Sequence, residues 1–408
     1  MSLLDRDNSH SRPETSLSLL LLVSLLSVAA RPTRSLAAIT KGPCLLRIHQ
    51  TRAALMWETD TEEASAVTYG KSGQPAMSVD SHPERVLHQT THGDGAFIHK
   101  VWIEALEPGQ IYHYRIAGAG LLSPTYEFRT VPSKTDRVTF TVYGDSRSHP
   151  EHHRKLVEQM IKIQPDFVIH TGDLVTSGRS YQRWGPEFFE PLKGLAETVP
   201  IYITKGNHEG NDGNFERLLV PPGEGNHFAF DYGPIHYFGG DNVSKRVNDD
   251  QLLKDIVNDA EMSNARWRFV SYHEPSLNLG GHDSHWKRQE ALPAFARAQV
   301  DFVVTGHSHL YERFKPVAPP QTGGSPVTYI TSGGGGASTH DIKPTKYHAT
   351  AKAVRHFCVF RIRNDSLTMD AIDEDGRIID HFQVTKQDGR LDNQYLQTAI
   401  PMNSLPAR

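Results

Sequence analysis

The sequence predicts two folded units in series: a small all-β sandwich, followed by a layered α/β domain with a buried sheet. Short alternating strands run from Leu45 to Thr130, and longer apolar runs separated by helix-like segments come after them. Immediately after those runs come polar residues that can bind metals. With 38% hydrophobic residues, the 408-residue chain can bury a large core, while a net charge of −4 gives no electrostatic support for nucleic-acid binding.

Residues 1–37 predict an export signal. The apolar stretch 17–30 is too short to span a bilayer comfortably, and small residues at 28–30 and 35–37 are suitable for cleavage. We therefore expect an exported protein, periplasmic or secreted, with no stable membrane span once the signal is removed. The alternatives are an uncleaved anchor or an exposed helix.

Residues 38–132 predict the sandwich. Six strand-like runs alternate with turn signals, and Tyr112 and Tyr114 share one face of a strand whose other face carries His113. Trp57 is expected in the core. Tyr112 is expected at a corner, where its hydroxyl can bond back to the backbone.

Residues 133–385 predict the α/β domain, after a linker at Val131–Lys134. Its first helix is expected at Pro150–Ile163, where apolar residues recur on one face. Turns are expected at Asn364-Asp365 and Asp375-Gly376. Residues 386–408 are polar, and we expect a loose tail there. The buried sheet is predicted by the apolar runs VTFTVY, DFVIH, VPIYIT, WRFVSY and DFVVT.

Two cysteines, Cys44 and Cys358, leave the question of a disulfide open. An oxidising compartment would permit a bridge, but the sequence cannot bring the two sulfur atoms together. Two separate buried thiols are the alternative.

Each of the five apolar runs ends in residues that can bind a metal or a phosphate. Loops beyond the carboxyl ends of strands converge on one crevice in layered α/β sheets, so these residues can form a single site. Aspartate and asparagine oxygens with imidazoles, and without thiolates, suit Fe, Zn or Mn. Six ligands exceed the need of one tetrahedral ion, so we expect two ions that share a carboxylate. The expected ligands are Asp145, Asp173, Asn207, His273, His307 and His309.

Two neighbouring features have open interpretations. Glu209 can orient a ligand or be an ordinary solvated acid. The run Gly333–Gly336 lacks the lysine of a phosphate-binding P-loop, and we interpret it as a close-packed loop near the metals.

The order GDSR, GDLV, GNHE, VSYH and GHSH resembles the metallophosphoesterase superfamily, in the branch similar to purple acid phosphatases. The resemblance covers nearly the whole mature chain. It implies a calcineurin-like four-layer α/β/β/α metallophosphoesterase domain, preceded by a fibronectin-III-like sandwich.

The resemblance also implies roles for single residues. His208 would face the substrate and stabilise the leaving oxygen or donate a proton. His282, or alternatively His285, would contact the phosphate. The first ion would be held by Asp145 and His309, the second by Asn207, His273 and His307, with Asp173 bridging them.

Two positions depart from the family pattern. Thr176 stands where purple acid phosphatases have the tyrosine that colours their ferric iron, so we expect no purple chromophore. Arg147 stands where other metallophosphoesterases have a ligating histidine. The first ion would then keep extra water, bind more weakly, or use Tyr181 or His149. Arg147 is also a candidate phosphate contact, with an internal ion pair as its alternative.

The sequence therefore predicts a dinuclear metal-dependent phosphomonoesterase that acts on small or exposed phosphate esters. A phosphodiesterase acting on nucleotides or lipid head groups is the alternative enzyme, because the same metal pair serves both reactions. A surface-binding protein with a degenerate metal site is the alternative from another class.

Overall fold

The computed structural model describes residues 37–74, 76–86, 96–118, 120–319 and 324–406. The predicted export signal lies outside this range except for Ala37. Within these ranges, no helix has the length and apolar character needed to cross a membrane.

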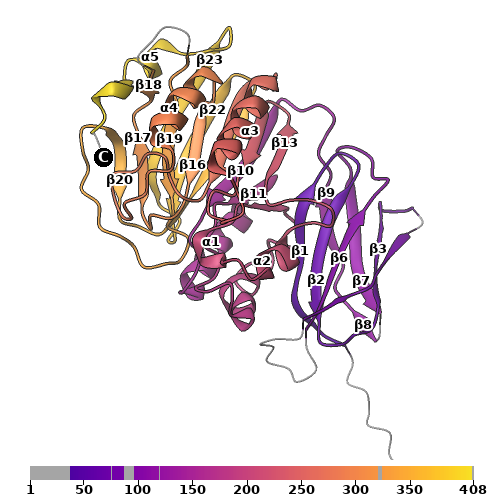
Figure 1. The fold of residues 1–408 in the computed structure, drawn as a ribbon. Helices are drawn as coiled ribbons and strands as arrows, with labels where there is room; N and C mark the ends of the chain where they lie inside the picture. The colour runs from indigo at the N-terminus through magenta and orange to yellow at the C-terminus, as the bar shows by residue number, and fades with distance from the viewer. Residues whose placement is uncertain (1–36, 75, 87–95, 119, 320–323, 407–408) are drawn as a thin grey trace, which may run out of the picture. The chain divides into compact units, whose positions relative to one another are not determined.

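The N-terminal unit is a sandwich of two antiparallel sheets (Figure 1). This architecture confirms the prediction from the alternating strands. The first sheet has the order β1 (Ile39–Ile48), β2 (Ala53–Thr59), β6 (Ala96–Ile103) and β5 (Glu84–Val86). The second has the order β4 (Met77–Ser81), β3 (Ser65–Gly70), β7 (Ile111–Gly118) and β8 (Leu121–Leu122), and β9 (Tyr126–Arg129) pairs with β7.

Trp57 and Tyr112 have the structural roles expected from the sequence. Trp57 is fully buried, stacks on the His99 ring at a centroid distance of 4.9 Å, and donates its Nε1–H to Ser65 Oγ. The Tyr112 hydroxyl accepts a hydrogen bond of 2.9 Å from the backbone N–H of Glu107. This contact closes the corner that precedes β7.

The second unit is built on two seven-stranded mixed sheets. The first has the order β12 (Ile201–Ile203), β11 (Phe167–His170), β10 (Arg137–Tyr143), β21 (His356–Arg363), β22 (Ser366–Asp373), β23 (Ile378–Gln387) and β24 (Arg390–Leu391). The second has the order β13 (Phe228–Tyr232), β14 (Ile235–Gly239), β15 (Trp267–Tyr272), β16 (Phe302–Thr305), β19 (Thr328–Ser332), β17 (Tyr311–Phe314) and β20 (His348–Lys352). The expected hairpin turns lie between β21 and β22 and between β22 and β23.

The two sheets pack face to face with helices on their outer sides, which confirms the four-layer α/β/β/α prediction. Alternate residues of each strand face the partner sheet, and the Phe140 ring of β10 meets the Phe269 ring of β15 edge-on at 5.2 Å. Tyr143, on the other face of β10, belongs to the core under the first helices. The second sheet is covered by α3 and α4 (Figure 1). The helices that precede the C-terminal segment are α1 (Pro150–Ile163), η1 (Tyr181–Arg183), η2 (Gly185–Phe189), η3 (Asn207–Glu209), α2 (Asn214–Leu219), α3 (Asp249–Met262) and α4 (Arg288–Arg297).

The first helix of this unit spans the predicted residues. It begins at Pro150. A proline suits the first helical position because the N–H that it lacks would have no partner within the helix there. The helix ends at Ile163, and the next residue, Gln164, has a left-handed conformation. Leu156, Val157 and Met160 are buried against the first sheet.

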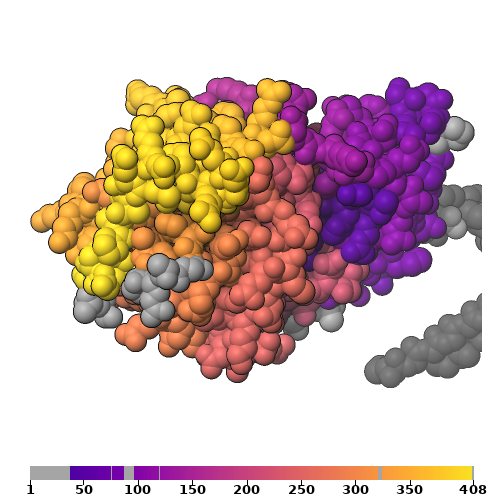
Figure 2. Space-filling view, turned by 90° about the horizontal axis from the view of Figure 1, so that it is seen from above, coloured from indigo at the N-terminus to yellow at the C-terminus, as the bar shows by residue number. Residues whose placement is uncertain are grey.

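The C-terminal segment is not the loose tail expected from its polar composition. It contains β24, α5 (Asn393–Leu396), β25 (Ile400–Pro401) and η4 (Met402–Ser404), and β25 pairs with β18 (Val317–Ala318). Tyr395 is buried, and its hydroxyl lies 2.5 Å from Thr328 Oγ1. Figure 2 shows this segment, in yellow, lying over the preceding orange part of the chain. A few buried apolar residues order the segment, and they are too few to be recognised in its polar composition.

Cys44 and Cys358 are both buried free thiols. Cys44 lies on β1 and Cys358 on β21, and they belong to different hydrophobic clusters. Burial raises the pKa of the Cys358 thiol to about 12. The described structure therefore matches the alternative of two separate thiols.

Candidate metal centre

The six expected metal ligands follow the carboxyl ends of five strands. In the first sheet β10, β11 and β12 are parallel neighbours, so the loops after them leave from one edge. In the second sheet β15 and β16 are parallel neighbours in the same way. These five loops carry Asp145, Asp173, Asn207, His273, and His307 with His309, in chain order.

One group of ligand atoms comes from four of these loops. Asn207 Oδ1 lies 2.9 Å from His273 Nε2 and 3.0 Å from His307 Nδ1, and His273 Nε2 lies 3.4 Å from Asp173 Oδ1. Adjacent ligands of one ion, each about 2.1 Å from it, are about 3 Å apart. His273 donates its Nδ1–H to the Thr171 carbonyl, so Nε2 is its nitrogen that faces the Asn207 oxygen. Two potential ligand atoms held this close suit a cation between them.

A second group surrounds Asp145. Its Oδ1 is buried without a hydrogen-bond partner within the described ranges, and it lies 3.5 Å from His309 Nε2. His309 donates its Nδ1–H to the Ser338 carbonyl at 2.9 Å, which leaves Nε2 as the ring nitrogen that can bind a metal. Ligand atoms of Asp145, Asp173 and His273 all lie within 4.8 Å of one another. The donor set therefore fits two ions that share Asp173.

The electrostatics of the carboxylates also fit bound cations. Burial raises the pKa of Asp145 well above its ordinary value. At Asp173 burial acts in the same direction, but the charges of His273 and His208 outweigh it, so its pKa is lowered. A cation beside Asp145 would offset the cost of burying its charge.

The histidines of the site also differ in the direction of their pKa shifts. Burial lowers the pKa of His307 to about 2 and that of His309 to about 4, so both rings are neutral, as ligands must be. Burial also lowers the pKa of His273, but the nearby Asp173 and Asp145 carboxylates outweigh it and raise this pKa. A bound cation would replace the proton that these carboxylates favour on His273.

The backbone is strained at three of the expected ligands. Asp145 and Asp173 both have φ of 58°, and His307 has φ of 69°, a left-handed region that non-glycine residues seldom adopt. Neighbouring loops hold these conformations. The Asp145 N–H donates to the Gly172 carbonyl, and the His307 N–H donates to Asp145 Oδ2, both at 2.9 Å.

Glu209 braces the loops that carry Asp173 and Asn207. It is fully buried, and its Oε2 accepts the N–H groups of Asp173 at 2.9 Å and Gly206 at 2.7 Å. Its Oε1 accepts the N–H of Leu174. Burial, with the Asp173 charge, raises its pKa to about 8. The alternative of a solvated acid is wrong for this residue.

The glycine loop packs closely beside Asp145, one of the expected metal ligands. A Cβ on Gly333 would lie 2.2 Å from the Ser308 carbonyl oxygen and 2.8 Å from Asp145 Oδ2. A Cβ on Gly335 would lie 2.3 Å from the Gly144 carbonyl oxygen. Side chains at these positions would push the loops apart.

His208 lies beside Asp173 and reaches solvent. Its Nδ1–H donates to the Thr176 carbonyl at 2.7 Å, which leaves Nε2 3.8 Å from Asp173 Oδ2. The side chain is 30% exposed. It can therefore meet a substrate that binds next to Asp173.

Arg147 spans two ligand atoms of the expected first ion. Its Nε–H donates to Asp173 Oδ2, and its Nη2–H donates to His309 Nε2, each at 3.2 Å. The guanidinium therefore pairs internally in this structure, which was the alternative to a phosphate contact. An ion that binds both atoms must displace it.

Neither substitute ligand considered from the sequence lies in the group. The Tyr181 hydroxyl donates to Glu58 and is buried against the sandwich. The His149 Nε2 lies 3.2 Å from Ser338 Oγ.

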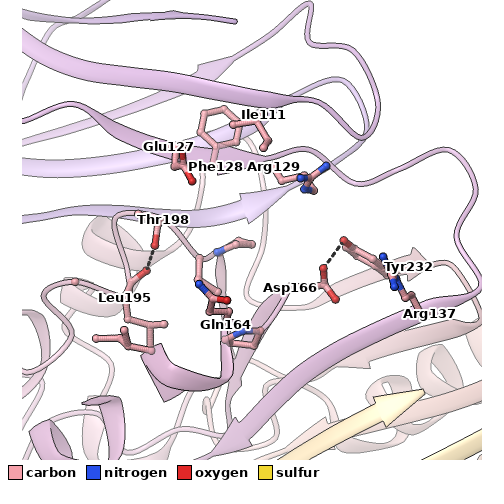
Figure 3. Close-up of a pocket in the computed structure, with 15 residues that line it drawn as sticks. Ile111, Glu127, Phe128, Arg129, Arg137, Gln164, Asp166, Leu195, Thr198 and Tyr232 are labelled. Carbon is pink, nitrogen blue, oxygen red and sulfur yellow. Dashed lines mark hydrogen bonds between the residues drawn. The ribbon is translucent and has the colours of Figure 1, made fainter. Parts of the chain in front are cut away.

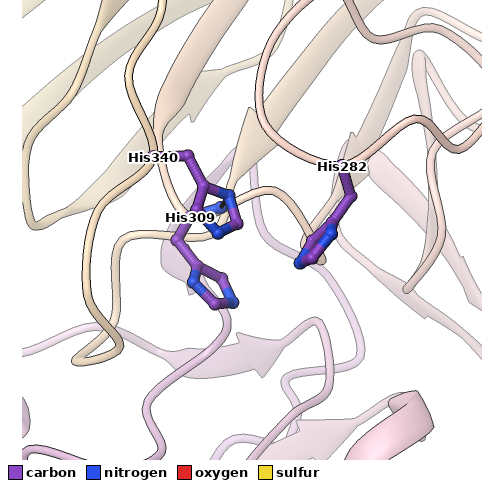
Figure 4. A group of neighbouring side chains, drawn as sticks. All are labelled: His282, His309 and His340. Atoms are coloured by element: carbon purple, nitrogen blue, oxygen red, sulfur yellow. Dashed lines mark hydrogen bonds between the residues drawn. The ribbon is translucent and has the colours of Figure 1, made fainter.

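Three histidines, one of them the expected ligand His309, lie close together (Figure 4). The His282 ring lies 4.5 Å from the His307 ring, whereas His285, its alternative, pairs with Asp283 at 3.1 Å. His340 stacks on His309 at 4.2 Å. Sequence reasoning missed His340, and the only signal for it was its place four residues after the glycine loop.

A separate cavity of about 680 Å³ lies away from these ligands (Figure 3). Its lining includes Arg137, Asp166 and Pro200, which start or directly precede β10, β11 and β12. The Tyr232 hydroxyl donates to Asp166 there at 3.0 Å. The cavity is therefore at the amino ends of the strands whose carboxyl ends carry the ligands.

Family comparisons match both units. Residues 138–311 match the family described as calcineurin-like phosphoesterase, and residues 45–130 match the purple acid phosphatase N-terminal domain. Purple acid phosphatase 21 of Arabidopsis thaliana is 30% identical over 68% of this chain and 67% of its own length. Acid phosphatase type 7 of Mus musculus is 23% identical over 71% of this chain and 77% of its own length.

A solved structure has the same fold across most of the chain. It is the purple acid phosphatase PPD1 isolated from seeds of yellow lupin (Lupinus luteus). It aligns with a TM-score of 0.71 and 17% sequence identity, covering 90% of this chain and 76% of the lupin chain.

Proposed function

Because this chain belongs to the purple acid phosphatase family and is a dinuclear metal-dependent phosphoester hydrolase, we propose that its substrates are phosphate monoesters. The observation that carries the proposal is the convergence of acceptor atoms from five loops of two sheets. The proposed metal ligands are Asp145, Asp173, Asn207, His273, His307 and His309, and the proposed ions are Fe, Zn or Mn.

When bound, the two ions supply Lewis acidity and a hydroxide nucleophile at mild pH. The chain's own residues would do the rest. His208 can hold or donate a proton at the leaving oxygen, because its Nε2 faces the site while its Nδ1–H is committed to the Thr176 carbonyl. Arg147 and His282 would hold the phosphoryl oxygens, Arg147 after its guanidinium leaves the ligand atoms.

A monoester suits this site better than a diester because of charge. A monoester carries a second negative charge, which Arg147, His208 and His282 can contact from the side facing solvent. A diester replaces that charge with a second ester group, which would gain less from these donors.

The first experiment compares p-nitrophenyl phosphate with bis-p-nitrophenyl phosphate, together with elemental analysis of the purified protein. We expect a higher kcat/KM on the monoester and metal bound near two ions per chain. Asp173→Ala should lower kcat/KM by about 100-fold or more, because it removes the shared ligand. Asp375→Ala, in an exposed turn, is the matched control. Preference for the bis ester would favour the phosphodiesterase alternative. Metal-free protein without turnover would favour the degenerate binding protein.

The export prediction belongs to the same proposal. We propose that residues 1–37 direct export and are removed, that 38–132 and 133–385 are the two domains, and that 386–408 complete the second. N-terminal sequencing of the exported protein tests this division. A mature protein that still begins at Met1 would contradict it.

A further inference from the structure

His340 is held against the metal ligand His309 by two backbone contacts. It lies in the segment between β19 and β20, after the glycine loop. The His309 N–H donates to His340 Nδ1 at 3.1 Å, and the His340 N–H donates to the His309 carbonyl at 2.8 Å. The two rings stack with an interplanar angle of 18°. The position of the His340 ring is therefore fixed by the chain that carries the ligand.

These contacts also fix where the His340 proton is. Because Nδ1 accepts the His309 N–H, it carries no proton, and a neutral imidazole then carries its proton on Nε2. The other tautomer would place two N–H donors against each other. His340 Nε2 is therefore a hydrogen-bond donor, with no lone pair to offer a metal.

This tautomer decides between two interpretations of the three histidines. Nitrogen atoms of His282, His309 and His340 lie within 4.8 Å of one another, which is close enough for a metal. A third metal there would need a lone pair from His340 Nε2. An anion needs the opposite, a donor, and His340 provides one.

The ring is also within reach of a ligand. His340 is half-buried and His282 is exposed, while His309 between them is buried. The His282 ring meets the His340 ring edge-on at 4.6 Å, and the two rings lie together with the His309 ring (Figure 4). A phosphate bound at the first ion would therefore lie next to both rings.

We propose that His340 is a substrate-contacting residue, whose Nε2–H donates to a non-bridging oxygen of the phosphate group beside His309. The inference rests on the proposed function, because it takes the phosphate ester as the ligand. It adds a donor from outside the five ligand loops.

The test uses the full chain loaded with metal and inorganic phosphate as a competitive inhibitor. His340→Phe keeps a stacking ring without a donor, and His340→Gln keeps a donor at the distance of Nε2. We expect His340→Phe to raise the Ki of phosphate and the KM of p-nitrophenyl phosphate by about 10-fold, and His340→Gln to restore most of both. Metal per chain should stay at the wild-type value in both variants. His82→Phe, on an exposed part of the sandwich, is the control.

Two outcomes overturn the inference. Loss of metal in His340→Phe and His340→Gln would make His340 a ligand, and unchanged Ki and KM in His340→Phe would leave it no substrate contact. Should His340→Phe fail to fold, His340→Asn takes its place, because its shorter amide cannot reach the position of Nε2. Should the wild type hydrolyse no monoester, the proposed function fails separately, and calorimetric titration with inorganic phosphate still measures the contribution of His340.

Discussion

At the scale of single residues, Arg147 distinguishes this site from a simple set of metal ligands. A guanidinium that already donates to Asp173 and His309 competes with any cation that needs the same atoms. Its own positive charge also repels such a cation. The site predicted for the first ion should therefore be the weaker of the two.

We expect Arg147→Ala to raise the amount of metal bound per chain after dialysis against limiting metal. The phosphate Ki should rise in the same variant, because a phosphate donor is lost. Elemental analysis and inhibition assays measure the two effects, and Arg147→Lys, which keeps the charge, should stay closer to the wild type in metal content. Unchanged metal content in Arg147→Ala would show that the guanidinium does not compete. Arg363→Ala, at a side chain 80% exposed, serves as the control.

Glu209 gives a second residue-scale prediction. Glu209→Ala would leave the buried N–H groups of Asp173, Leu174 and Gly206 without their acceptor. We expect a loss of about 2–4 kcal/mol in the free energy of unfolding, since each buried donor left unsatisfied is costly. Urea denaturation measures the loss. A loss below about 1 kcal/mol would mean that water replaces the carboxylate.

Single residues show how far the sequence alone can predict the candidate site. The sequence can predict the place of Asp145, Asp173 and Asn207, because each lies just after an apolar run that predicts a strand. It does not predict the place of His340, because this residue lies in an irregular segment with no strand end before it. The position of Arg147 required side-chain coordinates, because the sequence left both a phosphate contact and an ion pair possible.

At the scale of elements, β14 carries a histidine held between two carboxylates. His236 Nδ1 lies 2.8 Å from Asp231 on β13, and its Nε2 lies 2.5 Å from Asp259 on α3. Burial lowers its pKa, but the two hydrogen-bonded carboxylates outweigh burial and raise it to about 9. The protonated ring therefore ties α3 to the edge of the second sheet.

This raised pKa predicts a specific pH dependence. A group whose pKa is raised from 6.5 to about 9 on folding stabilises the fold fully below pH 6.5, and the contribution is lost as pH rises through 9. We expect the free energy of unfolding of the wild type to exceed that of His236→Gln by about 1–2 kcal/mol more at pH 6 than at pH 10. This range is below the full linkage value, because solvent screens the exposed Asp231. Denaturation series at both pH values measure it, and equal differences would contradict it.

The helices and strands also show which elements can be predicted from sequence composition and periodicity and which cannot. The helix at Pro150–Ile163 was predictable because its apolar residues recur on one face. The C-terminal segment was not, because Leu391 and Tyr395 are too sparse to form a periodic pattern. Their burial is a tertiary effect, set by contacts with strands far away in the sequence.

At the scale of the whole molecule, the sandwich and the α/β domain share one apolar cluster. Met56 of the sandwich belongs to the same buried group as Trp184 and Phe188 of the catalytic domain. The Tyr114 hydroxyl donates to the Glu197 carbonyl at 2.7 Å across the same boundary. Domains joined by a buried apolar interface lose part of their core when separated.

We therefore expect one cooperative unfolding transition for the two domains in calorimetry. A chain that begins at residue 133 should be less soluble, because it exposes the apolar face around Trp184 that the sandwich covers. Two resolved transitions, with the truncated chain as stable as the full one, would contradict this expectation.

The ligand loops leave from two different sheets, which gives the ions a mechanical role beside their chemical one. Asp145, Asp173 and Asn207 extend from one sheet, while His273, His307 and His309 extend from the other. Bound ions would cross-link the loops of the two sheets. Ligand binding to the folded state adds RT ln(1 + [L]/Kd) to the free energy of unfolding. Chelation should then lower the melting temperature and hasten proteolysis, and protein with Asp173→Ala should not respond in this way. A cell short of metal would lose this enzyme by degradation as well as by inactivity.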